Sequence, residues 1–389
     1  MLPRLKAGRT WLALTAAFVV AVAGQLVFNQ AVVNIRHIQG QAWALLRPGY
    51  DFWPIWIVDH LALYGHPAPH WYGAGVSNAW PPPHEVLLAP FGFLGYDGAW
   101  AASIVVTAAL MVFSVLLWSQ GGGNWQKVAW PILLTAPVFS VIWIDQLQAA
   151  LGLAGLSLAI WAQRREKWWL VGIAAGIGMI RVLNAIPVLC MLLLGGWGKP
   201  RQLAIAAGAV AAFMAPLLFI SYLWDHSFVT DYLAGLTAYP YNGAPKVATQ
   251  SFGIWGLALL LAMNCAAALW LVRKDVGRPL DAGRAGLGLA LTVAIAPVGG
   301  LYPGVFALPA LIRLGKRSRF AGVPWIAAVV PWLVILALSP LLLGNTPGMT
   351  LSYVSFIDYG LVFLCYPLLR IPPEEPVRPS VSPVASTAA

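Results

Sequence analysis

Long apolar stretches separated by short polar ones occupy most of this chain. Within each stretch the apolar residues run continuously and do not alternate with polar residues, which favours helices over the strands of a barrel. Backbone groups surrounded by hydrocarbon must satisfy their own hydrogen bonds, and a helix does this within one segment. The pattern therefore predicts an all-α fold, a polytopic transmembrane helix bundle of about 10–12 helices. The apolar segments lie at 11–33, 98–118, 128–144, 147–162, 168–180, 182–196, 203–224, 253–272, 284–301, 303–314, 322–343 and 351–369.

Lysine and arginine are concentrated in alternate loops. If the N-terminus lies in the cytoplasm, all but four of the 23 Lys and Arg residues fall on the cytoplasmic side, as the positive-inside rule requires. The apolar run after Arg9 continues towards Val33, so the first helix is expected to be retained and not cleaved as a signal peptide. The exceptions, which fall at the outer face, are Arg36, Arg47, Arg181 and Lys246.

The same topology divides the chain into one membrane domain, 1–370, and a tail. Two outer segments, 34–97 and 225–252, are longer than ordinary connectors, and such length favours a functional role. The first is rich in Trp, Tyr and Pro and is expected to contain short interfacial helices. The tail, 371–389, is rich in Pro, Ser, Val and Ala, which predicts a disordered cytoplasmic end.

Composition supports the membrane class and narrows the function. Of the 389 residues 60% are hydrophobic and 9% charged, against about 25% charged in a soluble domain. The net charge of +10 is interpreted as a topology signal facing anionic lipid and not as a nucleic-acid surface. Cys190, Cys265 and Cys365 each lie in an apolar segment without a partner at metal-like spacing. No metal, cofactor or disulfide is predicted.

The first outer segment contains an acid among large aromatic residues, in the run Gly49-Tyr50-Asp51-Phe52-Trp53. A partly desolvated carboxylate at Asp51 is a candidate general base, and Tyr50 and Trp53 offer faces on which a sugar can stack. An interfacial aromatic belt with a solvated aspartate explains the same pattern. Both interpretations remain open at this point.

Proline-rich turns follow in the same segment. The first includes Tyr64, in Tyr64-Gly65-His66-Pro67, and the second runs from Trp80 to Glu85 through three prolines and His84. Prolines at this density fix a rigid path back into the membrane. A surface hydrogen-bonding role for His84 is favoured over a metal site, because no second ligand pair has a recognisable spacing.

Polar residues also occur where apolar segments turn at the outer side. Asp145 and Gln146 precede the fourth predicted helix, and Arg181 and Asn184 separate the fifth from the sixth. A guanidinium near hydrocarbon is costly unless it snorkels or meets an anion, so Arg181 is either a phosphate ligand or a snorkelling side chain.

Two further polar positions lie near later helices. Gln250 and Ser251 precede the helix predicted at 253–272, where Ser251 is expected to cap it and leave backbone N–H groups for an anion, or to act as a cap alone. Asp358 lies inside the last apolar segment, and an intramembrane acid is a functional candidate by default.

Taken in order, these pieces resemble glycosyltransferase family 87, membrane enzymes of the GT-C type that use a polyprenyl-phosphate sugar donor. The family commonly has Lys where this chain has Arg181. The family often has a His near the outer end of a late helix. The corresponding region of this chain, Ala296 to Pro303, has no His, and the Tyr302 hydroxyl is the expected substitute for it. The matched positions, spread over about residues 20 to 315, are Asp51, Tyr64-Gly65-His66-Pro67, Trp80-Pro81-Pro82, Asp145-Gln146-Leu147-Gln148, Arg181 and Thr249-Gln250-Ser251.

The resemblance implies a GT-C-like domain and an inverting sugar transfer in which Asp51 deprotonates an acceptor hydroxyl. Arg181, with Gln146, Gln250 and Ser251, would bind the donor phosphate. The implied partners are a polyprenyl-phosphate sugar, with mannose or another hexose, a lipid or glycan acceptor, and membrane lipid, without nucleic acid, nucleotide or metal. The implied location is a bacterial inner membrane with the site facing the periplasm. Substrate-binding roles are expected for Tyr50, Trp53, Tyr64, Trp80, His84, Asp145, Asn184 and Tyr302.

A transporter or flippase of a lipid-linked or small polar substrate is the alternative function. That class predicts charged residues or helix breaks near the bilayer midplane, whereas the polar residues here are expected at the outer rim. A non-catalytic scaffold is a third possibility, but it gives the Asp51 segment no role. The transferase is therefore preferred.

Overall fold

The computed structural model describes residues 82–120, 125–224, 226–230, 232–233, 243–296, 301–344 and 347–372. Every regular element in these ranges is an α- or 3-10 helix, so the predicted all-α polytopic bundle is confirmed. The first predicted helix and most of the first outer segment lie outside the described residues. Five expected site residues fall there and stay predictions: Tyr50, Asp51, Trp53, Tyr64 and Trp80.

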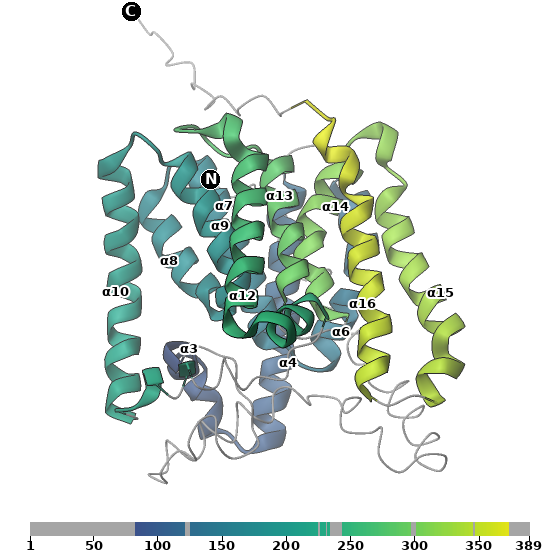
Figure 1. Ribbon diagram of the computed structural model, residues 1–389, viewed down its shortest axis with the longest axis horizontal. Helices are drawn as coiled ribbons and strands as arrows, with labels where there is room; N and C mark the ends of the chain where they lie inside the picture. Colours follow the sequence, from purple (N-terminus) through teal and green to yellow (C-terminus); the bar gives the residue numbers. More distant parts are fainter. Residues whose placement is uncertain are drawn as a thin grey trace, which may run out of the picture.

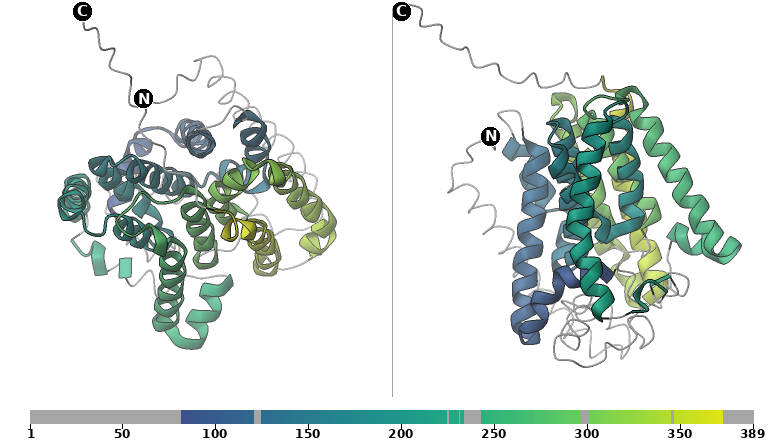
Figure 2. Two further views of the ribbon diagram at one scale, coloured as in Figure 1. Left: turned by 90° about the horizontal axis from the view of Figure 1, so that it is seen from above. Right: turned by 90° about the vertical axis from the view of Figure 1, so that its left-hand side faces the viewer.

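The helices follow the predicted apolar segments closely, and Figure 1 labels most of them. Figures 1 and 2 together show the long helices running side by side, with α10 and α15 at opposite edges of the bundle. The helices are α3 (Pro82–Leu88), α4 (Tyr96–Ser119), α5 (Trp125–Leu133), α6 (Ala136–Trp143), α7 (Leu147–Arg164), α8 (Trp168–Gly178), α9 (Val182–Gly195), α10 (Pro200–Trp224), α12 (Gly243–Val272), α13 (Ala282–Leu291), α14 (Leu308–Gly315), α15 (Val323–Gly344) and α16 (Pro347–Leu364).

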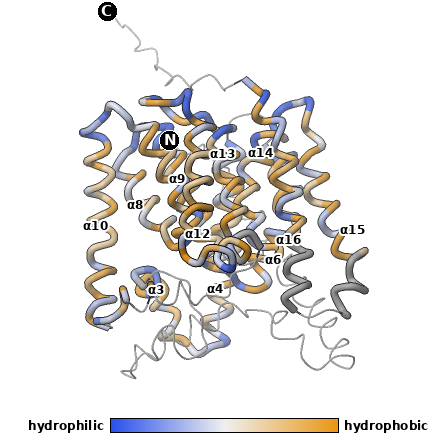
Figure 3. Tube along the Cα trace, in the orientation of Figure 1, coloured by the Kyte–Doolittle hydropathy of each residue, from blue (hydrophilic) through white to orange (hydrophobic). Residues whose placement is uncertain are grey.

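Polar residues gather where the helices end, and the middles of the helices are apolar (Figure 3). We call one end of the bundle the basic face, defined by Arg164, Lys199, Arg273, Arg284 and Lys316. In the described part of the chain, five helical stretches are long and apolar enough to cross a membrane by length and composition, one of them the bent stretch Trp168–Gly195, or six if the pair α5 and α6, bent by 54°, counts as one span. The chain is therefore a multi-pass membrane protein.

The stretch from α8 through η3 (Met179–Arg181) to α9 folds back on itself. Lys199 Nζ lies 2.7 Å from Glu166 Oε1, although these two residues flank opposite ends of the stretch. A Cβ added at Gly196 would also lie 2.9 Å from the Trp168 ring. Both ends therefore lie at the basic face, and the turn occurs at Arg181, whose φ of −112° and ψ of 71° interrupt the helix.

The arms of this hairpin are too short to cross a membrane. α8 has 11 residues and α9 has 14, or about 16 and 21 Å at 1.5 Å per residue. A complete span needs about 20 residues. The two segments predicted at 168–180 and 182–196 are thus the arms of one hairpin whose turn lies inside the bundle.

A second hairpin is built from α13 and α14. A Cβ at Gly286 would lie 3.1 Å from Ala310 N, so the arms touch. Lys316, after α14, donates hydrogen bonds to the carbonyls of Ser119 and Gln120 at the end of α4. With 10 and 8 residues, α13 and α14 are also shorter than a span. The two 3-10 helices next to their inner ends, η5 (Thr292–Ile295) after α13 and η6 (Tyr302–Ala307) before α14, are buried.

The start of α12 differs from the sequence prediction. The segment 225–252 was expected as a loop, but α12 already begins at Gly243 and is broken at Gly253, with φ 58° and ψ −147°. Only glycine adopts this conformation without strain. The chain therefore forms a short helix at 243–252 and turns at Gly253 into the long part of α12.

Glycines allow α7 and α8 to touch backbone to backbone. A Cβ added at Gly155 would lie 2.6 Å from Gly178 N and 2.8 Å from Ala174 O. Small residues at such crossings are what brings membrane helices together. The contact therefore fixes the position of the α8–α9 turn along the axis of α7.

Gly155→Ala is therefore expected to destabilise the protein, by about 1–3 kcal/mol for overpacking a tight contact. Gly208→Ala on α10 is the matched control, because no heavy atom lies within 4 Å of a Cβ there. Apparent melting temperatures in detergent compare the two. Equal melting temperatures for both variants would contradict a rigid α7–α8 contact.

Candidate functional site

The expected polar residues meet near the middle of the bundle. Thr107 lies twelve residues from Ser119, the last residue of the 24-residue helix α4, which is about 18 Å along an axis of about 36 Å. Its hydroxyl donates a hydrogen bond of 3.0 Å to Asp145 Oδ1. Asp145 is fully buried. The carboxylate thus lies far from both ends of α4.

The turn that presents Asp145 closes α6. Asp145 has φ 55°, a left-handed conformation that Asp tolerates better than most residues. The next N–H, of Gln146, bonds to Val141 O at 2.8 Å, which is the six-to-one bond of a Schellman ending. Gln146 then directly precedes α7. The local sequence therefore places an acid and an amide side by side at the turn between α6 and α7.

Arg181 reaches this turn from the hairpin of α8 and α9. Its Nη2 donates a short hydrogen bond to Gln146 Oε1, and its guanidinium lies 5.1 Å from the centroid of the Tyr302 ring. Only 4% of Arg181 is exposed. A Cβ at Gly152 would come within 2.9 Å of Arg181 Cγ, so the glycine leaves room for this side chain against α7.

The two hairpins are joined beside Arg181. Asn184 Nδ2 donates to the carbonyl and the hydroxyl of Thr292, at 3.0 and 3.1 Å. Thr292 in turn donates from Oγ1 to Leu289 O at 2.7 Å. These bonds hold the start of α9 against the end of α13, so Arg181 and Tyr302 approach each other from two turns with fixed relative positions.

Asp358 contacts the 3-10 helix η6, which carries Tyr302. It is 2% exposed on α16 and packs directly against Gly304 in η6. A Cβ at Gly304 would lie 2.5 Å from Asp358 Oδ1, so only glycine permits this approach. The intramembrane acid singled out in the sequence therefore braces the turn that carries Tyr302.

We call the residues that meet at these turns the central polar cluster, and their depth corrects one expectation. Arg181, Asp145 and Tyr302 were expected at the outer rim, but the two hairpins carry their turns to about half the depth of the bundle. Sequence reasoning assumed that each apolar segment was a full span, which would have put every turn at a surface. The central polar cluster comprises Thr107, Asp145, Gln146, Arg181, Asn184, Thr292 and Tyr302.

His84 and Glu85 on α3 are also buried, each about 1% exposed. His84 Nε2 lies 3.0 Å from Gly176 O, to which it donates. The surface role expected for His84 is therefore wrong, because α3 enters the bundle and contacts α8. Burial raises the pKa of Glu85 to about 8.

This pKa predicts a pH-dependent stability. Between pH of about 4.5 and 8 the folded protein keeps a proton on Glu85 that the unfolded chain releases. Stability therefore falls as pH rises through this window, by at most about 1.4 kcal/mol per pH unit. Glu85→Gln is expected to flatten that decline in apparent melting temperature, and Asp97→Asn, at an exposed acid, is the control. A decline that persists unchanged in Glu85→Gln would contradict this account.

Gln250 and Ser251 are not part of the described cluster. Both are exposed and lie in the short helix before Gly253, so Ser251 does not cap the helix that was predicted to begin at 253. Conversely, Gln148 was not assigned a site role, yet it is fully buried with neither amide atom hydrogen-bonded. Gln148 lies one helical turn from Gly152 on α7. Its place in the run Asp145-Gln146-Leu147-Gln148 could have identified it as a candidate site residue.

The central polar cluster offers one buried guanidinium, carboxylate and amide acceptors, and an aromatic face. A phosphate fits the Arg181 guanidinium in two-point geometry. Within the described residues no group of three His, Cys, Asp or Glu side chains could hold a metal ion. The arrangement is therefore suited to binding a phosphate-bearing, membrane-embedded ligand.

Comparisons with known proteins agree with this class. The family model described as glycosyltransferase family 87 matches residues 79–258. The chain is also 22% identical over 316 residues to a polyprenol-phosphate-mannose-dependent alpha-(1-2)-phosphatidylinositol mannoside mannosyltransferase of Mycobacterium tuberculosis, with 73% of this chain and 69% of that protein covered. No solved structure matches the chain.

Fold, buried polar centre and comparisons together define a polytopic membrane glycosyltransferase. Over residues 79–258 the chain matches glycosyltransferase family 87. The matched residues include His84, Asp145, Arg181 and the short helix before Gly253, but neither Asp51 nor Tyr302.

Proposed function

We propose that the protein transfers a hexose, with mannose as the first candidate, from a polyprenyl-phosphate donor to an acceptor hydroxyl on the outer side of a bacterial inner membrane. The observation that carries this proposal is the burial of Arg181 at a hairpin turn, held by Gln146 and Tyr302. The printed name of the mycobacterial relative supports this donor class.

The proposed reaction is a single displacement with inversion. Asp51 takes the proton from the acceptor hydroxyl, the hydroxyl oxygen attacks the anomeric carbon, and the bond from that carbon to the phosphate oxygen breaks. The lipid phosphate leaves with the bonding electron pair, and Arg181 stabilises the charge that grows on it. Gln146 fixes the orientation of the Arg181 guanidinium through their hydrogen bond. Asp51 enters this scheme from its place in the sequence alone.

The same site gives proposed positions for the donor phosphate and for the sugar. The donor phosphate would lie beside Asp145, Asn184 and Tyr302. His84 holds α3 against α8 through its hydrogen bond to Gly176. Tyr50, Trp53, Tyr64 and Trp80 would cover the sugar from the outer segment. Gln250 and Ser251 would join the donor site only if the short helix of α12 moved inwards.

A flippase for a lipid-linked substrate remains the second candidate because the charged residues lie deep. Charges and helix breaks near the midplane are typical of transporters. The same depth suits a transferase that must reach a lipid phosphate from within the membrane. The two functions differ in whether a glycosidic bond is formed.

Sugar transfer by the purified protein in nanodiscs tests the proposal. The donors are radiolabelled polyprenyl-phosphate mannose and other polyprenyl-phosphate hexoses, and the acceptors are an extract of host membrane lipids. We expect a labelled product with at least one donor. If no donor gives product and the protein instead moves polyprenyl-phosphate mannose between leaflets of proteoliposomes, the flippase replaces the transferase.

A further inference from the structure

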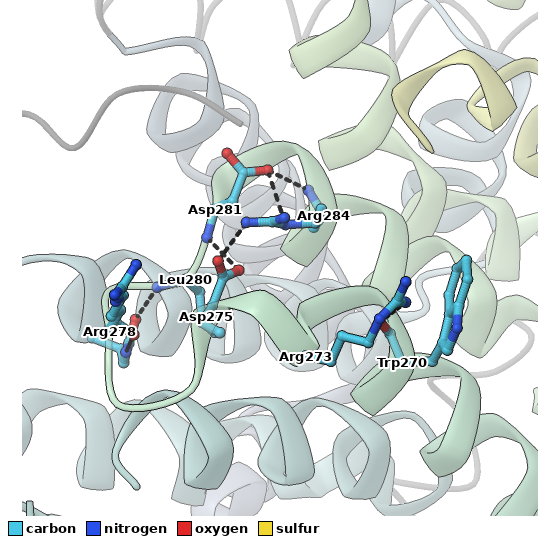
Figure 4. A network of polar contacts seen from close by, with 8 residues as sticks. Trp270, Arg273, Asp275, Arg278, Leu280, Asp281 and Arg284 are labelled. Carbon is cyan, nitrogen blue, oxygen red and sulfur yellow. Dashed lines mark hydrogen bonds and ion pairs between the residues drawn. The ribbon is translucent and has the colours of Figure 1, made fainter. Parts of the chain in front are cut away.

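A buried glutamine near the C-terminal end of α7 shows how such a side chain is satisfied inside this bundle. Gln163 is 1% exposed. Its amide nitrogen donates to Arg278 O at 3.0 Å, and its amide oxygen accepts from the Leu280 N–H at 2.9 Å. Figure 4 shows Arg278 and Leu280 in the loop before α13, near the ion pair of Arg284 with Asp275. Both amide atoms of Gln163 thus fasten this loop to α7.

A second buried glutamine, Gln148 at the start of α7, has no such partners. It is fully buried, and among the described residues neither its amide nitrogen nor its amide oxygen makes a hydrogen bond. Leaving a buried donor and acceptor unpaired costs free energy that a bound ligand can recover. Gln148, unlike Gln163, therefore keeps its hydrogen-bonding capacity for a ligand.

Gln148 lies in the first turn of α7, and this turn lies inside the bundle. α7 is 18 residues long and follows Gln146, which makes no capping hydrogen bond with its side chain. The N-terminal end of a helix carries partial positive charge and presents backbone N–H groups, an arrangement that suits phosphate. Asp145, the acid that precedes this turn, accepts a hydrogen bond from Thr107 of α4. The first turn of α7 therefore combines a helix N-terminus with a buried, unpaired amide.

Arg181 lies along the same face of α7 as Gln148. A Cβ added at Gly152 would lie 2.9 Å from Arg181 Cγ, so this side chain passes Gly152, and its guanidinium reaches Gln146 by a hydrogen bond. Gln148 is four residues before Gly152, which puts the two on one face of the helix, and helical side chains lean towards the N-terminus. The Gln148 amide and the Arg181 guanidinium are therefore both near the N-terminal end of α7 on this face.

We propose that Gln148 is a ligand of the donor phosphate, its amide nitrogen donating to a phosphate oxygen beside Arg181 at the N-terminus of α7. This inference rests on the proposed function and adds a residue to its donor site. Because the amide is enclosed, the phosphate reaches it as the Arg181 side chain exchanges its hydrogen bond to Gln146 for bonds to the phosphate. A guanidinium binds one phosphate at two points, and the Gln148 amide supplies a third contact from α7.

Binding of undecaprenyl phosphate, the donor lipid without its sugar, tests the proposal on the purified full chain in lauryl maltoside. Gln148→Met keeps the approximate size of the side chain and removes both amide atoms. Its dissociation constant for undecaprenyl phosphate should be about 10- to 100-fold higher than that of wild type, as for the loss of a hydrogen bond to a charged group. Without lipid, its apparent melting temperature should equal or exceed that of wild type, because the amide makes no hydrogen bond to the described residues.

Gln163→Met is the matched control, since it makes the same substitution on the same helix at an amide whose two hydrogen bonds hold a loop. It should lower the apparent melting temperature and leave the affinity for undecaprenyl phosphate unchanged. Unchanged affinity in Gln148→Met would overturn the proposal. A fall in melting temperature as large as that of Gln163→Met would assign Gln148 a structural role and overturn it as well.

Two further lipids separate the phosphate from the rest of the donor. Undecaprenyl-phosphate mannose should lose affinity in Gln148→Met by the same factor as undecaprenyl phosphate, and undecaprenol should bind wild type and variant alike. If only the mannose lipid is weakened, the amide contacts the sugar. If undecaprenol is weakened equally, the amide contacts the polyprenyl chain. Either result overturns the assignment to the phosphate.

Sugar transfer measured on the same preparations separates this inference from the proposed function. A wild-type protein that binds undecaprenyl phosphate with the expected dependence on Gln148 but forms no glycosidic bond contradicts the transferase and supports the phosphate site. Transfer by wild type together with unchanged affinity in Gln148→Met contradicts the phosphate site alone. A wild-type protein that binds no undecaprenyl phosphate contradicts both.

Discussion

Arg181→Gln is expected to reduce sugar transfer by about 100- to 1000-fold, the usual cost of removing one donor that stabilises developing charge. Arg181 is 4% exposed and its guanidinium is fixed by Gln146 and the Tyr302 ring, so bulk solvent is not positioned to replace it. Initial rates with polyprenyl-phosphate mannose and equilibrium binding of the donor measure the loss. Both rate and donor affinity should fall, because the phosphate is bound before and during transfer.

Two variants separate a phosphate contact from a structural role. Arg181→Lys keeps the charge and is expected to recover a large part of the activity lost in Arg181→Gln, although lysine cannot reproduce the two-point geometry. Arg201→Gln, at an exposed arginine of the basic face, should behave as wild type. Donor affinity that is unchanged in Arg181→Gln would remove Arg181 from the phosphate site.

Asp51→Asn is expected to lower transfer by about 100- to 10,000-fold, the range that a positioned general base contributes. Asparagine has nearly the shape of aspartate but cannot accept the acceptor's proton. Donor binding and apparent melting temperature should stay at wild-type values, because the proposed role of Asp51 is confined to the chemical step. Transfer assays and donor-binding isotherms on the same preparation test both expectations.

Asp59→Asn is the control for that experiment, since Asp59 lies in the same outer segment and outside the resemblance. It should retain activity. Loss of donor binding together with loss of transfer in Asp51→Asn would argue for a binding or structural role of Asp51. Full activity in Asp51→Asn would require another base in the proposed mechanism.

Hydrophobic pattern alone predicted most of the fold. Segment 98–118 became α4 and segment 203–224 became α10, each within about three residues at either end, because a long apolar helix in a membrane has few alternatives. Pattern could not reveal that the short segments on either side of Arg181 turn back. The contact that decides this, between Glu166 and Lys199, joins residues far apart in the chain.

The candidate site was predicted in part for a similar reason. Asp145, Gln146 and Arg181 were chosen as polar residues at turns, and the structure brings Arg181 and Gln146 into contact across 35 positions of sequence. Gln250 and Ser251 were matched to a motif but lie on an exposed short helix. The capping prediction for Ser251 was wrong because of the break at Gly253, since one glycine within an apolar run does not show in which direction the chain turns.

The two half-depth hairpins also constrain how the chain is built into the membrane during synthesis. An 11-residue arm such as α8 is too short to be held as a span by itself, and its turn carries the charge of Arg181. We therefore expect the α8–α9 hairpin to enter only as a pair, and to become stably seated once α7 and α10 flank it. A ribosome-bound chain that ends before α10 should leave this hairpin accessible from the side of synthesis, whereas one that includes α10 should protect it.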